Sequence, residues 1–94
     1  MHTVIPVKIA FDPAKDASNI AKHGVSLVDA ARLEWDGAIE WPDERRNYGE
    51  RRMVCLGYIG NRLFSVVFVD RGKERRIISL RKANRREEKM YAQT

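Results

Sequence analysis

Cysteine is almost missing from this chain of 94 residues, which has only Cys55. A single cysteine excludes an internal disulfide and a zinc site built from cysteines, and it fits a reducing cytoplasm best. Long hydrophobic runs are missing too, because the longest, at residues 63–69, is far too short to span a bilayer. The first residues lack the basic start and apolar run of a signal peptide. We therefore expect a cytoplasmic protein that has no contact with a membrane.

Acidic residues are the minority among the charged side chains. The chain has 13 Asp and Glu against 18 Lys and Arg, a formal net charge of +5. A basic balance points to polyanions, namely RNA, DNA, an anionic membrane surface or an acidic protein partner. The apolar content of 44% is ordinary for a folded protein and is enough for one modest core. We therefore expect a single domain over residues 1–94.

The pattern of apolar residues predicts an α+β domain. Its elements are a strand within residues 4–11, helices over 13–23 and 27–33, strands over 51–59, 62–70 and 74–81, and a helix over 84–91. Asp12 and Pro13 are typical of a helix start, and Gly24 is typical of a helix end. Asn84 with Glu87 three residues later is typical of the capping pair that begins a helix. The Gly60-Asn61 pair predicts a hairpin. The expected fold is a small antiparallel sheet, a meander plus an N-terminal edge strand, with two helices before the meander and one after it.

The stretch from residue 34 to residue 50 is the least regular part of the chain. It is acidic within a basic protein, and it contains both tryptophans, Trp35 and Trp41. We expect Ile39 and Trp41 to pack onto the edge of the sheet. A role of this stretch as a lid or as a contact for a partner is the alternative.

Basic residues are densest in the last quarter of the chain, where the predicted third strand runs into the last helix. Strict alternation along that strand places Arg75, Ser79 and Arg81 on one face. Arginine suits phosphate because its planar fork makes two parallel hydrogen bonds and stays charged at any working pH. Each of these charges alone is best read as solvated. As a group they favour a surface that faces phosphate: Arg75, Arg76, Arg81, Lys82, Arg85, Arg86 and Lys89.

A set of short motifs resembles the BrnT family. They are FDPAK at 11–15, Asn19, KHG at 22–24, YGE at 48–50, Arg52, GY at 57–58, RIISLRKA at 76–83, Glu87 and Tyr91. The resemblance covers nearly the whole chain. It implies a toxin of a bacterial type II toxin–antitoxin system, with a fold like that of the RelE-like ribonucleases. It also implies an endoribonuclease that stops translation by cutting RNA.

The same resemblance implies the partners. The toxin would be neutralised by a BrnA antitoxin, which carries a ribbon-helix-helix DNA-binding domain, in a hetero-oligomeric complex. That complex would repress its own operon, so operator DNA would be contacted only through the antitoxin.

Cleavage of RNA needs neither a cofactor nor a metal, because the ribose 2′-hydroxyl can attack the adjacent phosphate. Arg76 and Arg81 are the candidates for binding that phosphate and stabilising the transition state. On a regular strand they face opposite sides, so both reach one site only if the strand twists or bulges, or if the site lies at the rim of the sheet. Arg75 is the alternative to Arg76. Lys22, Ser79 and Lys82 are further candidates for phosphate binding.

Three other residues are candidates for proton transfer. His23 is the first, because histidine has an ordinary pKa of ~6.5; the alternative is a helix C-cap that interacts with the helix dipole. Tyr91 is a candidate acid or stacking partner for a base, or else an anchor of the last helix. Glu50 is a candidate base, or else the partner of an arginine in a turn or cross-strand ion pair. The alternative for the whole protein is a non-catalytic module that binds nucleic acid or protein.

Overall fold

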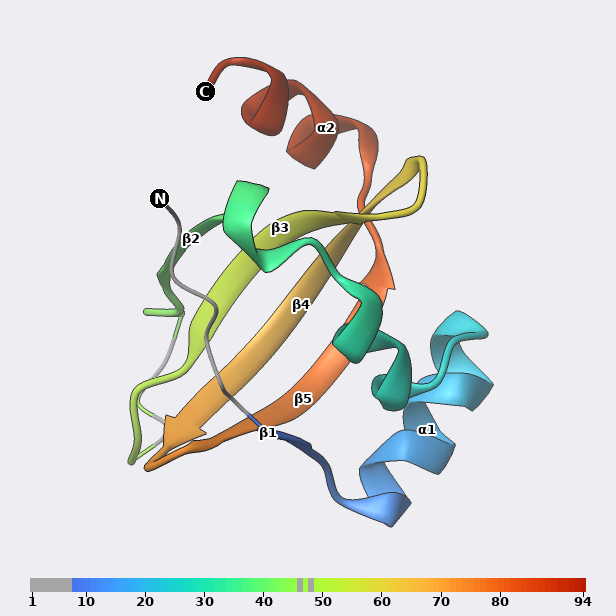
Figure 1. Ribbon diagram of the computed structural model, residues 1–94, viewed down its shortest axis with the longest axis vertical. Coiled ribbons are helices and arrows are strands. Elements are labelled where there is room, and N and C mark those ends of the chain that lie inside the picture. The colour runs from blue at the N-terminus through green and yellow to red at the C-terminus, as the bar shows by residue number, and fades with distance from the viewer. Residues whose placement is uncertain (1–7, 46, 48) are drawn as a thin grey trace.

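A five-stranded sheet with strand order β1-β5-β4-β3-β2 forms the centre of the molecule (Figure 1). The computed structural model describes residues 8–45, 47 and 49–94. The strands are β1 (Lys8–Ala10), β2 (Ile39–Pro42), β3 (Met53–Ile59), β4 (Arg62–Arg71) and β5 (Glu74–Lys82). The helices are α1 (Pro13–His23), the 3₁₀-helices η1 (Leu27–Arg32) and η2 (Trp35–Gly37), and α2 (Arg85–Ala92). The predicted α+β class is confirmed.

The helix ends form where the sequence predicts them. The carboxylate of Asp12 accepts a hydrogen bond from the backbone N–H of Ala14, and Gly24 ends α1 with a φ of 76° in the left-handed region that favours glycine. At the start of α2, Asn84 and Glu87 cap each other reciprocally through their side chains and backbone N–H groups. No helix in the described part of the chain is long and apolar enough to cross a lipid bilayer.

Three features of the fold differ from the prediction. The sheet is mixed, because β1 runs parallel to β5 while the other pairs are antiparallel. The irregular stretch contributes a strand of its own, β2, which was missed because it is short and ends at Pro42; Ile39 and Trp41 do lie at the sheet edge, as expected. The second helix, η1, is a 3₁₀-helix in place of the expected α-helix. The part of the first predicted strand before Lys8 lies outside the described residues.

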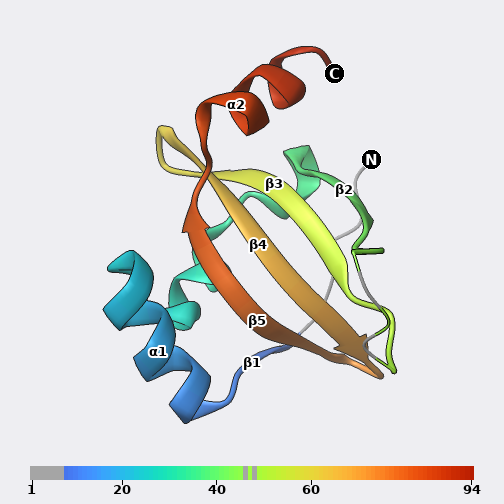
Figure 2. The ribbon, with the colours of Figure 1, turned by 180° about the vertical axis from the view of Figure 1, so that it is seen from behind.

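The two faces of the sheet differ in what covers them. One face, called the covered face below, packs against η1 and contains the larger core cluster, with Leu27, Phe68 and Ile77 fully buried. The opposite face carries a smaller cluster around Leu56 and Leu63. Figure 2 shows that β3, β4 and β5 lie uncovered by helices along most of this side, with α2 at one end. We call it the open face.

A bulge interrupts the pairing of the two longest strands, β4 and β5. Val67 is paired with Ser79, but the next residue, Phe68, is paired with Ile77, so Ile78 has no residue opposite it. An extra residue in one strand reverses the alternation of side chains beyond it. The predicted strict alternation along this strand is therefore wrong.

The bulge decides which side chains of β5 point to which face. Ile77 and Leu80 both belong to the buried cluster of the covered face although they are three positions apart, where strict alternation would place them on opposite faces. The residues on the other side of the strand therefore lie together on the open face. These residues are Arg76, Ser79 and Arg81.

Asn19 of α1 holds the free edge of β5 beyond the short strand β1. Its side-chain amide donates to the backbone oxygen of Leu80 at 2.7 Å, and its side-chain oxygen accepts from the backbone N–H of Leu80 at 3.2 Å. The same amide donates to the oxygen of Val25 at 2.9 Å. This buried side chain therefore replaces a neighbouring strand at this position and fixes the last turn of α1 beside the end of β5 (Figure 2).

Candidate functional site

The open face is arranged in rows of residues that lie opposite one another on neighbouring strands. The registers give one row of Trp41, Val54, Val67 and Ser79, one of Ile39, Leu56, Ser65 and Arg81, and the pair of Val69 and Arg76. The row that ends in Ser79 therefore lies between Arg76 and Arg81. With ~3.3 Å of rise per strand residue, these two arginines are roughly 15 Å apart along β5.

A cleft of about 340 Å³ opens on this face. Val54 of β3 and Val67 of β4 lie at the bottom of the cleft. Trp41 lies on the edge strand β2, and Ser79 and Arg81 lie on β5. The cleft also borders charged side chains of both signs and the beginning of α2: Asp43, Glu44, Arg45, Asn84, Arg86 and Glu87. Most of the exposed lining of the cleft is polar, and Val54 and Val67 supply an apolar part.

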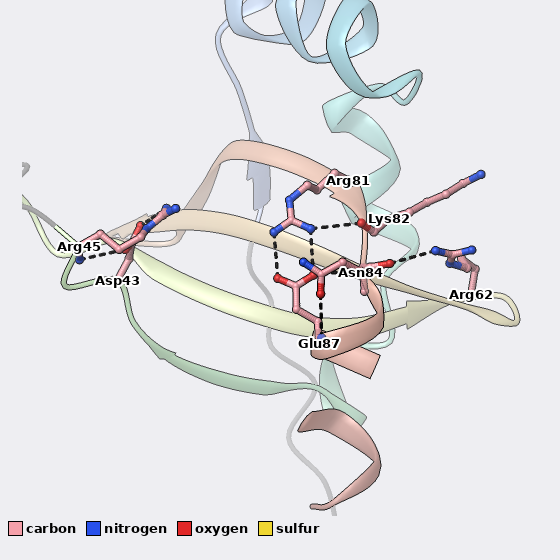
Figure 3. A network of polar contacts seen from close by, with 8 residues as sticks. Asp43, Arg45, Arg62, Arg81, Lys82, Asn84 and Glu87 are labelled. Carbon is pink, nitrogen blue, oxygen red and sulfur yellow. Dashed lines mark hydrogen bonds and ion pairs between the residues drawn. The ribbon is translucent and has the colours of Figure 1, made fainter. Parts of the chain in front are cut away.

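Arg81 is held at the end of β5 by Glu87, the third residue of α2. Its two terminal nitrogens donate to the two oxygens of the Glu87 carboxylate at 2.9 Å each, and one of them also donates to the backbone oxygen of Lys82 at 3.2 Å (Figure 3). The hydrogen bonds from Arg81 lower the pKa of Glu87, which is therefore a carboxylate at neutral pH. This geometry leaves the Nε–H edge of the guanidinium for a ligand.

Arg76 is less firmly bound than Arg81. Its side chain is 32% exposed, and its nearest carboxylate is that of Glu74 at 3.7 Å, which is too long for a hydrogen bond. Its Nε is buried and has no hydrogen-bond partner among the residues that the structure describes. A guanidinium with unused donors can still bind an anion.

Glu50 lies near the Arg76 end of the open face and is an ion-pair partner. Its carboxylate accepts a hydrogen bond at 2.7 Å from Arg71, the last residue of β4. Glu50 itself lies in the bend before β3, so of the alternative reading the ion pair with an arginine is present. That hydrogen bond, with the positive charges of Arg71, Arg52 and Arg76, lowers the pKa of Glu50. A carboxylate with a lowered pKa is a weaker base than an ordinary one.

Lys22 and His23 form the last turn of α1 and are both exposed. Asn19 fixes this end of the helix against Leu80. Because one helical turn advances ~5.4 Å, His23 lies about one turn beyond Asn19, the residue that binds Leu80 of β5. The last turn of α1, with Lys22 and His23, is therefore attached to the edge of β5.

Arg75 does not belong to this group, and the prediction that it shares a face with Ser79 and Arg81 is wrong. It lies on the covered face, is only 8% exposed, and donates two hydrogen bonds to Asp70 at 2.7 and 2.9 Å. Its guanidinium carbon lies 4.7 Å from the ring centre of Trp35. Burial by itself lowers the pKa of Arg75, but the hydrogen bond and charge of Asp70 outweigh it, so the pKa is raised.

Tyr91 and Lys82 point away from the group around Arg81. The hydroxyl of Tyr91 donates to the backbone oxygen of Gly37 at 2.6 Å, and its ring lies edge-on to that of Tyr58 at 5.4 Å. These contacts fit the anchor of the last helix, which was the alternative for Tyr91. The side chain of Lys82 extends away from Glu87 into solvent (Figure 3).

The sequence reading missed the part that Glu87 and Trp41 have in this surface. Glu87 was recognised only as a helix cap, yet the same carboxylate also holds Arg81. Its position three residues after Asn84 was the available signal. Trp41 was placed at the sheet edge, but its row with Val54 and Val67 depends on strand registers that no local motif encodes. Within the described ranges, no group of three or more His, Cys, Asp or Glu side chains is arranged to hold a metal ion.

A protein-family model and a solved structure are similar to this chain. A family model described as "Ribonuclease toxin, BrnT, of type II toxin-antitoxin system" matches residues 11–87. The crystal structure of the Brucella abortus ribonuclease toxin BrnT is similar over 84% of this chain and 99% of that one, with 28% identity and a TM-score of 0.68. No curated protein sequence matches the chain. The likeness to the RelE-like ribonucleases stays a prediction. The range matched by the family model contains the open face from Trp41 to Glu87.

Proposed function

The chain belongs to the BrnT family of ribonuclease toxins of type II toxin–antitoxin systems, and we propose that it cuts RNA on the open face of its sheet without a metal ion. The observation that carries this proposal is the bulge, which brings Arg76, Ser79 and Arg81 to one side of β5. Two arginines roughly 15 Å apart on one strand match the backbone of a bound single strand, whose phosphates need several positive groups in line.

The cleavage that we propose is attack by a ribose 2′-hydroxyl on the adjacent phosphate. Negative charge builds on the phosphate oxygens, and a fixed guanidinium stabilises it without reorganising during the reaction. Arg81 suits this role because Glu87 and the backbone of Lys82 fix its orientation while its Nε–H edge remains available. Arg76 then binds another phosphate farther along the same strand, with Ser79 between the two arginines.

His23 is the group that we propose for proton transfer. It lies one helical turn beyond Asn19, which binds Leu80 next to Arg81, and histidine exchanges protons near neutral pH. Glu50 is the weaker candidate because its pKa is lowered and its carboxylate is bound to Arg71. Lys22, next to His23, adds positive charge at the same end.

We further propose that the antitoxin is of the BrnA type, that it neutralises the toxin by covering the open face, and that the complex represses its own operon. Cutting of cellular RNA by the free toxin would stop translation. A net charge of +5 fits an acidic covering segment, because opposite charges speed association and make it sensitive to salt. The family belongs to type II toxin–antitoxin systems, so it implies that an antitoxin partner exists; only the type of antitoxin is our proposal.

The proposal is tested by incubating the purified protein with total RNA in EDTA, beside Arg81→Ala and Arg32→Ala variants. Arg32 is an exposed arginine of η1, on the covered side of the sheet, and is the matched control. We expect cleavage by the parent and by Arg32→Ala, and little or none by a folded Arg81→Ala. Equal cleavage by all three proteins would contradict a site at Arg81. RNA bound without cleavage by any of them would favour a non-catalytic binding module.

A further inference from the structure

We propose that the cleft of the open face is a subsite for one nucleobase of the RNA, formed by Trp41, Val54, Val67 and Ser79. This inference rests on the proposed function, since it assigns the base next to the phosphates that Arg76 and Arg81 bind. The four residues form one continuous row across β2, β3, β4 and β5. The row ends at Ser79, between the two arginines.

The volume of the cleft and its lining residues fit a small, partly apolar group such as a nucleobase. Its volume of about 340 Å³ is within the usual range for a small-molecule site, ~300–1,000 Å³. Val54 and Val67 are half-buried and lie side by side on neighbouring strands, which gives an apolar floor. Trp41 adds an aromatic ring at the edge strand. Proteins hold unpaired RNA bases by stacking them on such rings.

The charges around the cleft are mixed. Asp43, Glu44 and Glu87 border it, and so do Arg45, Arg81 and Arg86. Asp43 is bound to Arg45, and Glu87 is bound to Arg81, so these charges largely offset each other within the cleft. A neutral base suits such a lining, while phosphates on either side of the base meet Arg76 and the Nε–H edge of Arg81.

Polar groups in the cleft can read the edge of a base. Ser65 and Ser79 both line it, and a serine hydroxyl is both a hydrogen-bond donor and an acceptor. Ser65 lies opposite Arg81 in the register, one row away from Ser79. Ser65 is only 3% exposed, whereas Ser79 is half-buried, so we infer that the hydroxyl of Ser79 contributes to the preference of the toxin for particular bases.

The two tryptophans differ in a way that makes the inference measurable. The indole N–H of Trp35 donates to the backbone oxygen of Ala30 at 3.1 Å, on the covered face. Trp41 lies in the cleft of the open face. A base that enters the cleft should therefore shift the indole N–H resonance of Trp41 and leave that of Trp35 in place.

The first experiment adds each of the four nucleoside 3′-monophosphates to the ¹⁵N-labelled protein and follows both indole resonances, which a Trp41→Phe variant assigns. We expect at least one nucleotide to shift the Trp41 resonance, and ribose 5-phosphate and inorganic phosphate to leave it unchanged. The inference is overturned if no nucleotide shifts this resonance more than ribose 5-phosphate does. Because no cleavage is needed, this result is independent of whether the protein is a ribonuclease.

The second experiment measures the rate of cleavage of a defined RNA in which single nucleotides near the cut are made abasic. Loss of the base that occupies the cleft should slow cleavage on the order of tenfold, as expected for one stacked base. Ser79→Ala should change the relative rates at different cut sites, whereas Ser18→Ala, at an exposed serine of α1, should not. Equal rates for every abasic RNA would overturn the subsite while leaving the ribonuclease activity standing. Failure to cut even the intact RNA would instead count against the proposed function.

Discussion

The guanidinium of Arg81 and the carboxylate of Glu87 are joined by two parallel hydrogen bonds of 2.9 Å. This pair links the end of β5 to the first turn of α2, and one of the carboxylate oxygens also accepts from the backbone N–H of Asn84. A single side chain thus caps the last helix and fixes the arginine that we place on the phosphate. We therefore expect stability and activity to be coupled at this point of the molecule.

Glu87→Gln tests that coupling, because glutamine keeps the helix cap but cannot form the charged pair. We expect the variant to be about 1–2 kcal/mol less stable to urea, since hydrogen bonds between charged groups are stronger than neutral ones. Its cleavage rate should fall on the order of tenfold because the guanidinium of Arg81 is no longer held. Glu88→Gln, at the exposed neighbouring position, is the control. An unchanged cleavage rate in a folded Glu87→Gln protein would show that Arg81 needs no such support.

The same pair predicts a pH dependence of stability. Arg81 lowers the pKa of Glu87 in the folded protein below its value in the unfolded chain, ~4.3. The stabilising effect is therefore fully present above that value and is lost as the pH falls through the folded pKa. We expect the free energy of unfolding to decline more steeply below about pH 4.5 in the parent than in Glu87→Gln. Glu50, whose pKa is also lowered, contributes a decline of the same sign that both proteins retain. Identical declines would contradict a lowered pKa of Glu87.

Local signals in the sequence were enough for the helix caps, the hairpin turns and the three long strands, because each depends on neighbouring residues. Asn84 and Glu87 form their capping pair as predicted, and Gly60 has the positive φ, 63°, that its turn requires. The bulge at Ile78 could not be predicted, since it is a property of the register between two strands. That one residue moved Arg75 to the covered face and Arg76 to the open face. The sequence therefore indicated which residues are candidates for the site, but it did not indicate which of them share a face of the sheet.

Arg75→Lys tests whether Arg75 is structural. Lysine cannot make both hydrogen bonds to Asp70 or lie flat against Trp35, so we expect a loss of about 1–3 kcal/mol in the free energy of unfolding. Cleavage should stay within about twofold of the parent rate at a temperature where the variant is folded. Urea denaturation and a single-turnover assay give the two quantities. A large loss of activity without a loss of stability would restore Arg75 as a phosphate ligand.

Asn19→Ala removes the side chain that holds the free edge of β5. It leaves the buried N–H and oxygen of Leu80 without their partner, so we expect a destabilisation of about 2–4 kcal/mol. Native-state hydrogen exchange should show faster exchange of the Leu80 amide, while Ser18→Ala should leave it unchanged. Cleavage should fall as well, because the last turn of α1, with His23, loses its attachment to β5. A protected Leu80 amide in the variant would mean that another group replaces Asn19.

The central claim is that RNA lies on the open face, and methyl NMR with an uncleavable RNA tests it most directly. RNA with 2′-O-methyl groups cannot be cut, since the attacking hydroxyl is blocked. Val54 and Val67 report on the open face, and Val28, 50% exposed on η1, reports on the other side. We predict that this RNA shifts the methyl resonances of Val54 and Val67 and leaves those of Val28 in place. Shifts at Val28 with Val54 and Val67 unchanged would contradict the claim.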